Sequence, residues 1–287
     1  MSVFSAIVIG DESLTISCSD MLMERGHRLT ALVTRNPDVA DWARAAGVTV
    51  LASPGDLNAG HSADWLFSIA NLQLIPEDTL ALGRKGAVNF HDGPLPAYAG
   101  LNAPVWALLN GETSYGVSWH LMEAGIDKGD LVATQPVPVN DDDTALSLNA
   151  KCYAAGMESF EGLITRIASG TMQRSPQDFT QRSYFGKNRR PVAAGRLNFN
   201  SPAVDLLRLH RAMEFGGYWN PLTRPKIDIG AGVLAVAQAK SEEGAGAPGT
   251  LLEVGADHVS VACAEGAIRL SGLTDLNGHA LRVSDHL

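Results

Sequence analysis

The sequence predicts an α/β protein, in which a doubly wound, mostly parallel sheet precedes a small C-terminal β-barrel of the OB type. Apolar runs alternate with helix-like segments over about the first ninety residues. Several of these runs are continuous, which is typical of strands buried on both faces of a parallel sheet. After residue 205, short candidate strands follow one another between glycines.

Local patterns place each element of the first half. Strands are expected at residues 5–10, 28–34, 48–51, 64–70 and 86–91, and helices at 13–26, 36–47 and 76–86. Gly26 suits the end of the first helix, Pro37 the start of the second, and Pro76 with its acidic neighbours the start of the third. Ligands of such sheets bind beyond the carboxyl ends of the strands.

The second half contains the longest predicted helix, residues 144–170, with Thr144 as N-cap. Other helices are expected at 103–112 and 202–213, and strands at 115–122, 131–139, 225–230, 233–240, 249–255, 258–263 and 267–273. Residues 181–199 are loop-like. We therefore expect a catalytic domain at 1–180, a linker at 181–204 and a barrel domain at 205–287.

Composition restricts the class of protein. With a net charge of −9 and a pI near 5.3, the chain is not expected to present a surface built mainly for nucleic acid. Cys18, Cys152 and Cys263 lie far apart without CxxC spacing, so we expect buried residues rather than a disulfide framework or zinc site. The N-terminal apolar run is too short for a signal peptide or membrane span, and a cytoplasmic protein is expected.

The stretch NFHDGPLPAYAG carries the first chemical signal. Asn89 and His91 end a predicted strand, and residues two apart on a strand point the same way. His91 is suited to accept a proton near neutral pH, and Asn89 to donate a hydrogen bond to a developing oxyanion. Alternatively, His91 is a strand-end residue whose ring bonds to a main-chain carbonyl.

A second signal is EAGIDKGDLV, in which Asp127 and Asp130 flank Gly129. Asp in such a turn commonly caps the turn's own backbone. In the alternative interpretation, Asp127 pairs with His91 and stabilises the protonated ring. His120 is interpreted as a strand residue near the site rather than a ligand. The segment VIGDESL lacks two glycines of GxGxxG, so NAD binding has little support.

Together, these motifs resemble the N10-formyltetrahydrofolate-dependent formyltransferase family, over essentially the whole chain. Asn89-x-His91 precedes a loop ending in Leu95-Pro96, and GIDKGD places its Asp127 thirty-six residues after the histidine. The resemblance implies a formyl donor, N10-formyltetrahydrofolate, and no metal. It implies catalytic roles for Asn89, His91 and Asp127. It also implies folate contacts from Gly93, Pro94, Leu95 and Pro96, from Leu72, Gln73 and Leu74, and from Gly125 and Ile126.

Two stretches depart from the family pattern: GPLP replaces SLLP in the folate loop, and YAGLNAP, on the acceptor side, lacks the usual basic residue. These variants look most like formylation modules of peptide and polyketide assembly lines. We therefore expect an amino-acid-like amine, either free or carrier-bound, as acceptor. Sugar-nucleotide or methionyl-tRNA formyltransferase, formyltetrahydrofolate hydrolase and a catalytically inactive interaction module are the alternatives.

Charge bears on the choice among acceptors. Residues 205–287 hold seven Lys or Arg against ten Asp or Glu, so tRNA is expected to be an unlikely partner. A basic run without acids covers residues 182–196; its cations are Arg182, Lys187, Arg189, Arg190 and Arg196. This run is either a surface for an acidic carrier protein or nucleotide-sugar phosphate, or a solvated linker.

Overall fold

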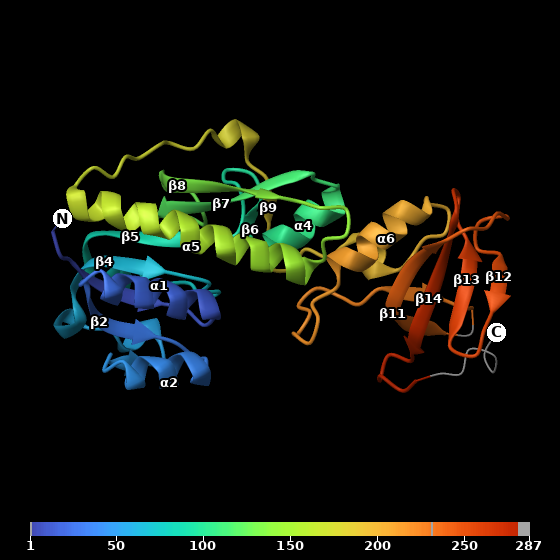
Figure 1. Ribbon diagram of the computed structural model, residues 1–287, viewed down its shortest axis with the longest axis horizontal. Coiled ribbons are helices and arrows are strands. Elements are labelled where there is room, and N and C mark those ends of the chain that lie inside the picture. Colours follow the sequence, from blue (N-terminus) through green and yellow to red (C-terminus); the bar gives the residue numbers. More distant parts are fainter. Residues whose placement is uncertain (1, 231, 281–287) are drawn as a thin grey trace. The chain divides into compact units, whose positions relative to one another are not determined.

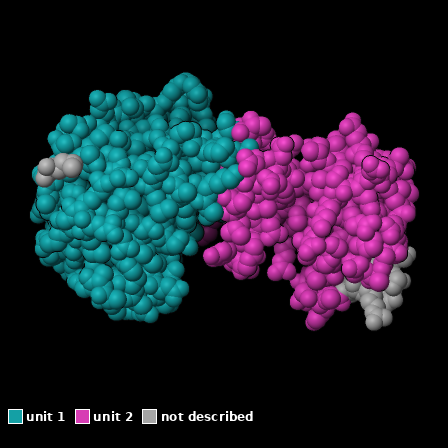
Figure 2. All heavy atoms as spheres, viewed as in Figure 1, with its two compact units in different colours: residues 1–103, 114–139, 149–185 teal, residues 104–113, 140–148, 186–287 magenta. Residues whose placement is uncertain are grey.

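The computed structural model describes residues 2–230 and 232–280 (Figure 1). The chain divides into two compact units, which are described separately (Figure 2). The first comprises residues 1–103, 114–139 and 149–185, and the second residues 104–113, 140–148 and 186–287. Each unit is a compact body made of several separate segments of the chain. Such units do not test the expected functional division at residues 180 and 204, which stays a prediction.

A seven-stranded sheet organises the first unit, in the order β3-β2-β1-β4-β5-β7-β8. Its strands are β1 (Ser5–Ile9), β2 (Arg28–Val33), β3 (Val50–Leu51), β4 (Ala63–Ser68), β5 (Gly83–His91), β7 (Ser114–Leu121) and β8 (Leu131–Pro138). The first five are parallel, whereas β7 and β8 are antiparallel to their neighbours. The predicted doubly wound, mostly parallel sheet is confirmed.

Helices α1 (Ser13–Glu24), α2 (Pro37–Ala45), α4 (Ala103–Asn110) and α5 (Ala145–Ser169) lie where the sequence predicts them. Short 3₁₀ turns lie at η1 (Pro54–Asp56), η2 (Ala59–His61) and η3 (Phe179–Gln181). The Thr144 hydroxyl accepts a hydrogen bond from the amide of Ser147 at 3.1 Å, as expected of an N-cap.

Helix α3 (Glu77–Leu80) is much shorter than the expected 76–86. That prediction is wrong because Gly83 and Gly86 already belong to β5, where they pair with Ala63 and Trp65 of β4. A Cβ atom at Gly83 would lie 2.8 Å from the amide nitrogen of Leu66. Glycine therefore permits a close approach between two parallel strands rather than ending a helix.

Helix α5 packs tightly against the strands that carry the site. Trp119 of β7 stacks on Phe160 with ring centroids 4.8 Å apart, and its indole nitrogen donates to the Ser159 hydroxyl at 2.9 Å. A Cβ atom at Gly156 would lie 2.7 Å from the Phe90 ring, so only glycine allows α5 this close to β5. This buried aromatic packing fixes the adjacent ends of β5 and β7.

The second unit contains a five-stranded antiparallel sheet of order β10-β11-β14-β13-β12. Its strands are β10 (Lys226–Asp228), β11 (Val233–Glu242), β12 (Leu251–Val254), β13 (His258–Ala262) and β14 (Ala267–Thr274). Helix α6 (Ala203–Ala212) and the turn η4 (Val192–Gly195) precede them. Leu206 of α6 shares one core with Val236, Val259 and Ile268 of the sheet. The expected barrel-like C-terminal sheet is confirmed.

The run 181–199 is less irregular than expected. Within the first unit, β9 (Tyr184–Phe185) pairs in parallel with β6 (Ala99–Gly100). The ring of Phe185 stacks on Tyr98 at 5.4 Å with an interplanar angle of 7°. This aromatic contact explains why the segment is ordered despite its polar composition. The three cysteines are buried, as predicted. None of the described helices has the length and apolar character needed to cross a membrane.

Candidate active site

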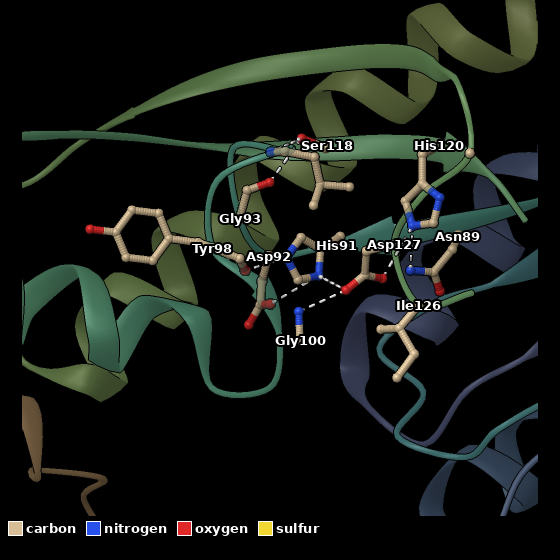
Figure 3. Close-up of polar contacts among 12 residues, drawn as sticks. Asn89, His91, Asp92, Gly93, Tyr98, Gly100, Ser118, His120, Ile126 and Asp127 are labelled. Carbon is tan, nitrogen blue, oxygen red and sulfur yellow. Dashed lines mark hydrogen bonds and ion pairs between the residues drawn. The ribbon is translucent and has the colours of Figure 1, made fainter. Parts of the chain in front are cut away.

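Strand pairing between β5 and β7 builds the first part of the site (Figure 3). The antiparallel register sets Asn89 opposite His120 and His91 opposite Ser118. Directly opposed residues lie on the same face of a sheet. The side-chain nitrogen of Asn89 consequently lies 3.2 Å from His120 Nε2.

His91 ends β5 and is only 5% exposed. Its Nε2 lies 2.8 Å from the carbonyl oxygen of Tyr98. A carbonyl only accepts hydrogen bonds, so Nε2 carries the hydrogen and the neutral ring keeps its lone pair on Nδ1. The carbonyl contact considered as an alternative role is therefore present, and it sets the tautomer that leaves Nδ1 available as a base.

Asp127 brings the second motif to this ring. Its backbone adopts φ 52°, in the left-handed region that Asp tolerates better than most residues. One carboxylate oxygen lies 3.8 Å from His91 Nδ1 and accepts the amide of Gly100 at 2.8 Å. The other lies 3.4 Å from His120 Nε2. The carboxylate therefore bends back to the end of the sheet instead of capping its own turn.

The electrostatics of Asp127 favour its ionised form. Burial by itself would raise the pKa of the carboxyl. The hydrogen bond from His120, the charge of His91 and the amide of Gly100 outweigh burial and lower the pKa from 3.8 to about 2. Asp127 is thus a carboxylate at neutral pH and able to stabilise a protonated His91.

His120 joins Asn89 to Asp127. Its Nδ1 lies 2.7 Å from the Leu121 carbonyl oxygen and must donate to it. In the neutral ring, Nε2 accepts from the Asn89 amide; in the protonated ring, it donates to Asp127. Sequence patterns placed His120 only near the site, because the strand register that puts it opposite Asn89 is not visible in a single sequence.

The segment after α5 holds the backbone around Asp127. The Gln177 side chain donates to the carbonyls of Asp127 and Gly129, at 3.1 and 2.7 Å. Arg182 donates to the carbonyls of Asp127 and Ile126, at 3.1 and 2.8 Å. Four hydrogen bonds therefore fix the loop that turns the carboxylate inward. Arg182, which was expected in the basic run of the linker, supplies two of these hydrogen bonds.

The loop Gly93–Pro96 follows His91 directly, and Ser118 of β7 stabilises it. The Ser118 hydroxyl donates to the Gly93 carbonyl at 2.8 Å and accepts the Leu95 amide at 3.0 Å. A Cβ atom at Gly93 would lie 2.7 Å from His91 Nε2 and 3.2 Å from the Tyr98 oxygen. Ser118 thus supplies a hydroxyl to a loop that lacks the serine of SLLP, and Gly93 makes room for the histidine.

The other residues expected to contact folate lie in two segments. Leu72 and Leu74 are 78% and 84% exposed, while Gln73 bonds through its backbone to the Asn71 side chain. Gly125 lines a pocket of about 440 Å³ in the first unit, together with Ile75, Leu80 and residues 122–124. Ile126 lies near Asn89 and Asp127 (Figure 3) and is 45% exposed.

The structure therefore brings Asn89, His91 and Asp127 together, with Gly93–Pro96 adjoining them. It adds His120, Ser118, Asp92 and Arg182, none of which was predicted as a site residue. Among the residues that the structure describes, no group of three or more His, Cys, Asp or Glu is arranged to hold a metal ion. The arrangement provides a buried imidazole base, a carboxylate to stabilise its protonated form and an amide donor for an oxyanion.

Comparison with known proteins identifies relatives of both halves. The family model "Formyl transferase" matches residues 55–164, and "Formyl transferase, C-terminal domain" matches 191–287. A methionyl-tRNA formyltransferase of Myxococcus xanthus is 31% identical, covering all of this chain and 90% of that protein. Another, of Ectopseudomonas mendocina, is 33% identical over 77% of this chain and 68% of that protein.

Solved structures agree in fold. WlaRD, a sugar 3N-formyltransferase, superimposes with a TM-score of 0.73 at 17% identity, covering 94% of this chain and 98% of that one. An N-formyltransferase from Helicobacter canadensis, crystallised with folinic acid and dTDP-3-aminofucose, gives 0.71 at 17% identity, covering 95% and 100%. HypX from Aquifex aeolicus, in complex with tetrahydrofolic acid, gives 0.69 at 18% identity, covering 96% and 45%.

These relatives overturn one expectation from the sequence. The charge of residues 205–287 was taken to disfavour tRNA, yet both relatives compared by sequence are methionyl-tRNA formyltransferases. The exclusion was wrong because it used the summed charge of one domain. Phosphate contacts depend on local clusters of cations, and the run 182–196 lies outside the residues counted.

Proposed function

The chain belongs to the formyltransferase family, and we propose that it moves the formyl group of N10-formyltetrahydrofolate to the primary amine of an aminoacyl acceptor, with methionyl-tRNA as the leading candidate. The observation that carries the proposal is the convergence of Asn89, His91 and Asp127 at the end of β5 (Figure 3). Three polar groups from two distant motifs meet there in the arrangement that acyl transfer to an amine requires.

In this mechanism, His91 acts as the base. A primary amine is mostly protonated at neutral pH and attacks only after it loses a proton. Nδ1 of His91 takes that proton, and the Asp127 carboxylate stabilises the resulting imidazolium. The amine nitrogen then bonds to the formyl carbon while the bond to N10 breaks. N10 receives the proton held by His91, and the second proton that the amine nitrogen loses passes to His91 and then to solvent. No atom of the protein becomes acylated.

Asn89, oriented by His120, stabilises the negative charge on the formyl oxygen. As the amine adds, negative charge develops on that oxygen, and the Asn89 amide is placed to donate a hydrogen bond to it. One N–H of the amide bonds to neutral His120, which fixes its orientation and leaves the second N–H for the substrate. An oriented donor stabilises the transition state more than a freely rotating one.

The chain's own residues fit a folate donor. The pocket beside Gly125 has apolar walls from Ile75, Leu80 and Met122 and carboxylates from Glu77 and Glu123. A flat pterin ring needs apolar contact on its faces and acceptors for its N–H groups. Leu72 and Leu74 are exposed and lie close in sequence to Ile75, which lines this pocket. A ligand that covered them would remove their apolar surface from water, which is favourable.

The acceptor assignment rests on the relatives and on the basic run. Lys187, Arg189, Arg190 and Arg196 are exposed in the second unit, where their positive charge can contact phosphate. Arg196 also pairs with Asp228 at 3.3 Å, and the Arg189 guanidinium lies 5.1 Å from the centre of the Trp106 ring. An aminoacyl ester also offers the α-amine that the mechanism requires.

The test is a panel of acceptors incubated with N10-formyltetrahydrofolate and analysed by mass spectrometry. The panel contains methionyl-tRNA, aminoacyl carrier proteins, free amino acids and amino-sugar nucleotides. We expect a mass gain of one formyl group on methionyl-tRNA. Formylation of another member alone would replace the acceptor but keep the reaction. Formate release without any acceptor would instead identify a hydrolase, and the His91→Ala variant provides the background.

A further inference from the structure

A second carboxylate faces the base. Asp92 directly follows His91, and its Oδ1 lies 3.9 Å from His91 Nδ1, on the same nitrogen that Asp127 approaches to 3.8 Å (Figure 3). Both separations exceed hydrogen-bond length, so neither carboxylate bonds directly to the ring. The backbone of Asp92 is also fixed, because its carbonyl accepts the Tyr115 hydroxyl at 2.8 Å.

The three groups differ in their access to solvent. The His91 ring is 5% exposed, the Asp127 side chain 10% and the Asp92 side chain 28%. Asp92 is therefore the member of the cluster that a molecule arriving from solution meets first. Two carboxylates around one lone pair repel each other and the lone pair, and low solvent access strengthens this repulsion. Protonation of His91 relieves this repulsion, and so does a bound group that carries positive charge and N–H donors.

Other acidic groups act on the same place. Burial raises the pKa of Asp92; the charge of His91 lowers it, and that of Asp127 adds to the increase. Burial raises the pKa of Tyr153 on α5, and the charges of Asp92 and Glu12 raise it further. Burial and the charge of Asp11 raise the pKa of Glu12, which precedes α1. Tyr153 is neutral near pH 7 and adds no charge, but Asp92, Asp127 and Glu12 are acidic groups whose ionised forms a bound cation would stabilise.

We propose that Asp92 is an acceptor-binding residue that, with Asp127, holds the ammonium group of the incoming amine against Nδ1 of His91. The inference rests on the proposed function and names the charge state in which the acceptor binds. The ammonium donates one N–H to each carboxylate and points the third at Nδ1. Transfer of that proton breaks an N–H bond, forms the Nδ1–H bond and leaves the electron pair on the amine nitrogen, ready to attack.

The experiment compares Asp92→Asn and Asp92→Ser with the wild-type chain, using the acceptor that the wild type formylates in the panel above. At pH 6.5, where the amine is protonated, we expect both variants to raise KM for the acceptor roughly tenfold or more, the scale of one lost charged hydrogen bond. The ratio of variant to wild-type KM should fall towards one at pH 9, because a neutral amine gains little from the carboxylate.

Controls separate binding from general damage. Asp130→Asn removes the same charge from the neighbouring GIDKGD motif and should leave KM within twofold. Affinity for tetrahydrofolate, measured by calorimetry, and the melting temperature should be unchanged in the Asp92 variants. A wild-type chain that formylates nothing would refute the proposed function. An active wild type with an unchanged KM in the variants, or an equal loss at both pH values, would refute the role of Asp92 alone.

Discussion

The polar centre around His91 and the loop that carries Leu72 and Leu74 belong to the same compact unit but are built in opposite ways. In the centre, Asp127 is bonded through its carboxylate to Gly100 and through its backbone to Gln177 and Arg182. In the loop, the two leucines are 78% and 84% exposed.

This difference suits the two regions to different roles: the polar centre to the chemical step, and the loop to contact with a ligand. Reacting groups must hold their geometry before the substrate arrives, because reorganising them during the reaction would cost rate. A surface that only covers a ligand gains its stabilisation when apolar area is buried on binding. We therefore expect substitutions in the centre to lower kcat and substitutions in the loop to raise KM for the folate.

Removing the base or its carboxylate partner should have the largest effect. His91→Ala or Asp127→Ala is expected to lower kcat roughly 10²-fold or more, the scale of a positioned acid or base. Steady-state formyl transfer measures the loss, while melting temperature and tetrahydrofolate binding report whether the fold and donor site survive. Near-normal turnover in either variant would remove that residue from the mechanism.

Gly93→Ala should be the next most severe change. The added methyl group would lie 2.7 Å from His91 Nε2 and push the ring away from the Tyr98 carbonyl. Because small displacements of reacting groups are costly, we expect kcat to fall roughly tenfold or more. Gly217→Ala is the matched control, since nothing lies within 4 Å of its Cβ position. Equal activity in both variants would show that the centre tolerates movement.

Arg182→Ala tests the support behind Asp127. Loss of its hydrogen bonds to the Ile126 and Asp127 carbonyls should lower kcat roughly fivefold, corresponding to about 1 kcal/mol. Arg174→Ala, an exposed cation earlier in the same segment, should have no effect. Added guanidinium ion should partly restore Arg182→Ala and not His91→Ala. A loss of similar size in both arginine variants would point to surface charge instead.

Leu72→Ser and Leu74→Ser should have the smallest effect. Each removes exposed apolar area that the folate of the proposed reaction would cover, so KM for the folate should rise about threefold with kcat unchanged. Val192→Ser, 92% exposed in the second unit, provides the control. A fall in kcat without a change in KM would mean that this loop takes part in the chemical step. The loop and the polar centre around His91 would then not differ in role.

Much of the fold follows from the sequence, because buried parallel strands and helix caps leave local patterns. Residues 5–9 and 28–33 are continuous apolar or mixed runs and form β1 and β2 as expected. The helix expected at 76–86 failed where Gly83 and Gly86 enter β5. The prediction was wrong because these glycines allow β4 to approach β5 closely. That approach is a tertiary contact, and it leaves no signal in the local sequence.

The site was only partly predictable for the same reason. Asn89, His91 and Asp127 were found through spacing and resemblance. His120 entered the site through the antiparallel register of β5 and β7, and Arg182 through a bond across fifty-five positions of the chain. A period-two pattern on β7 does place His120 and Ser118 on one face, which was the available hint. Which strand lies opposite them is a property of the topology.

The segment from Gln177 to Phe185 has a consequence for dividing the chain. A fragment that ended at residue 180 would retain all seven strands of the large sheet. It would nevertheless lack the Arg182 guanidinium and the Phe185 carbonyl that receives the Leu101 amide. Attempts to transplant the catalytic half into another enzyme, or to express it alone, should therefore place the cut after residue 185.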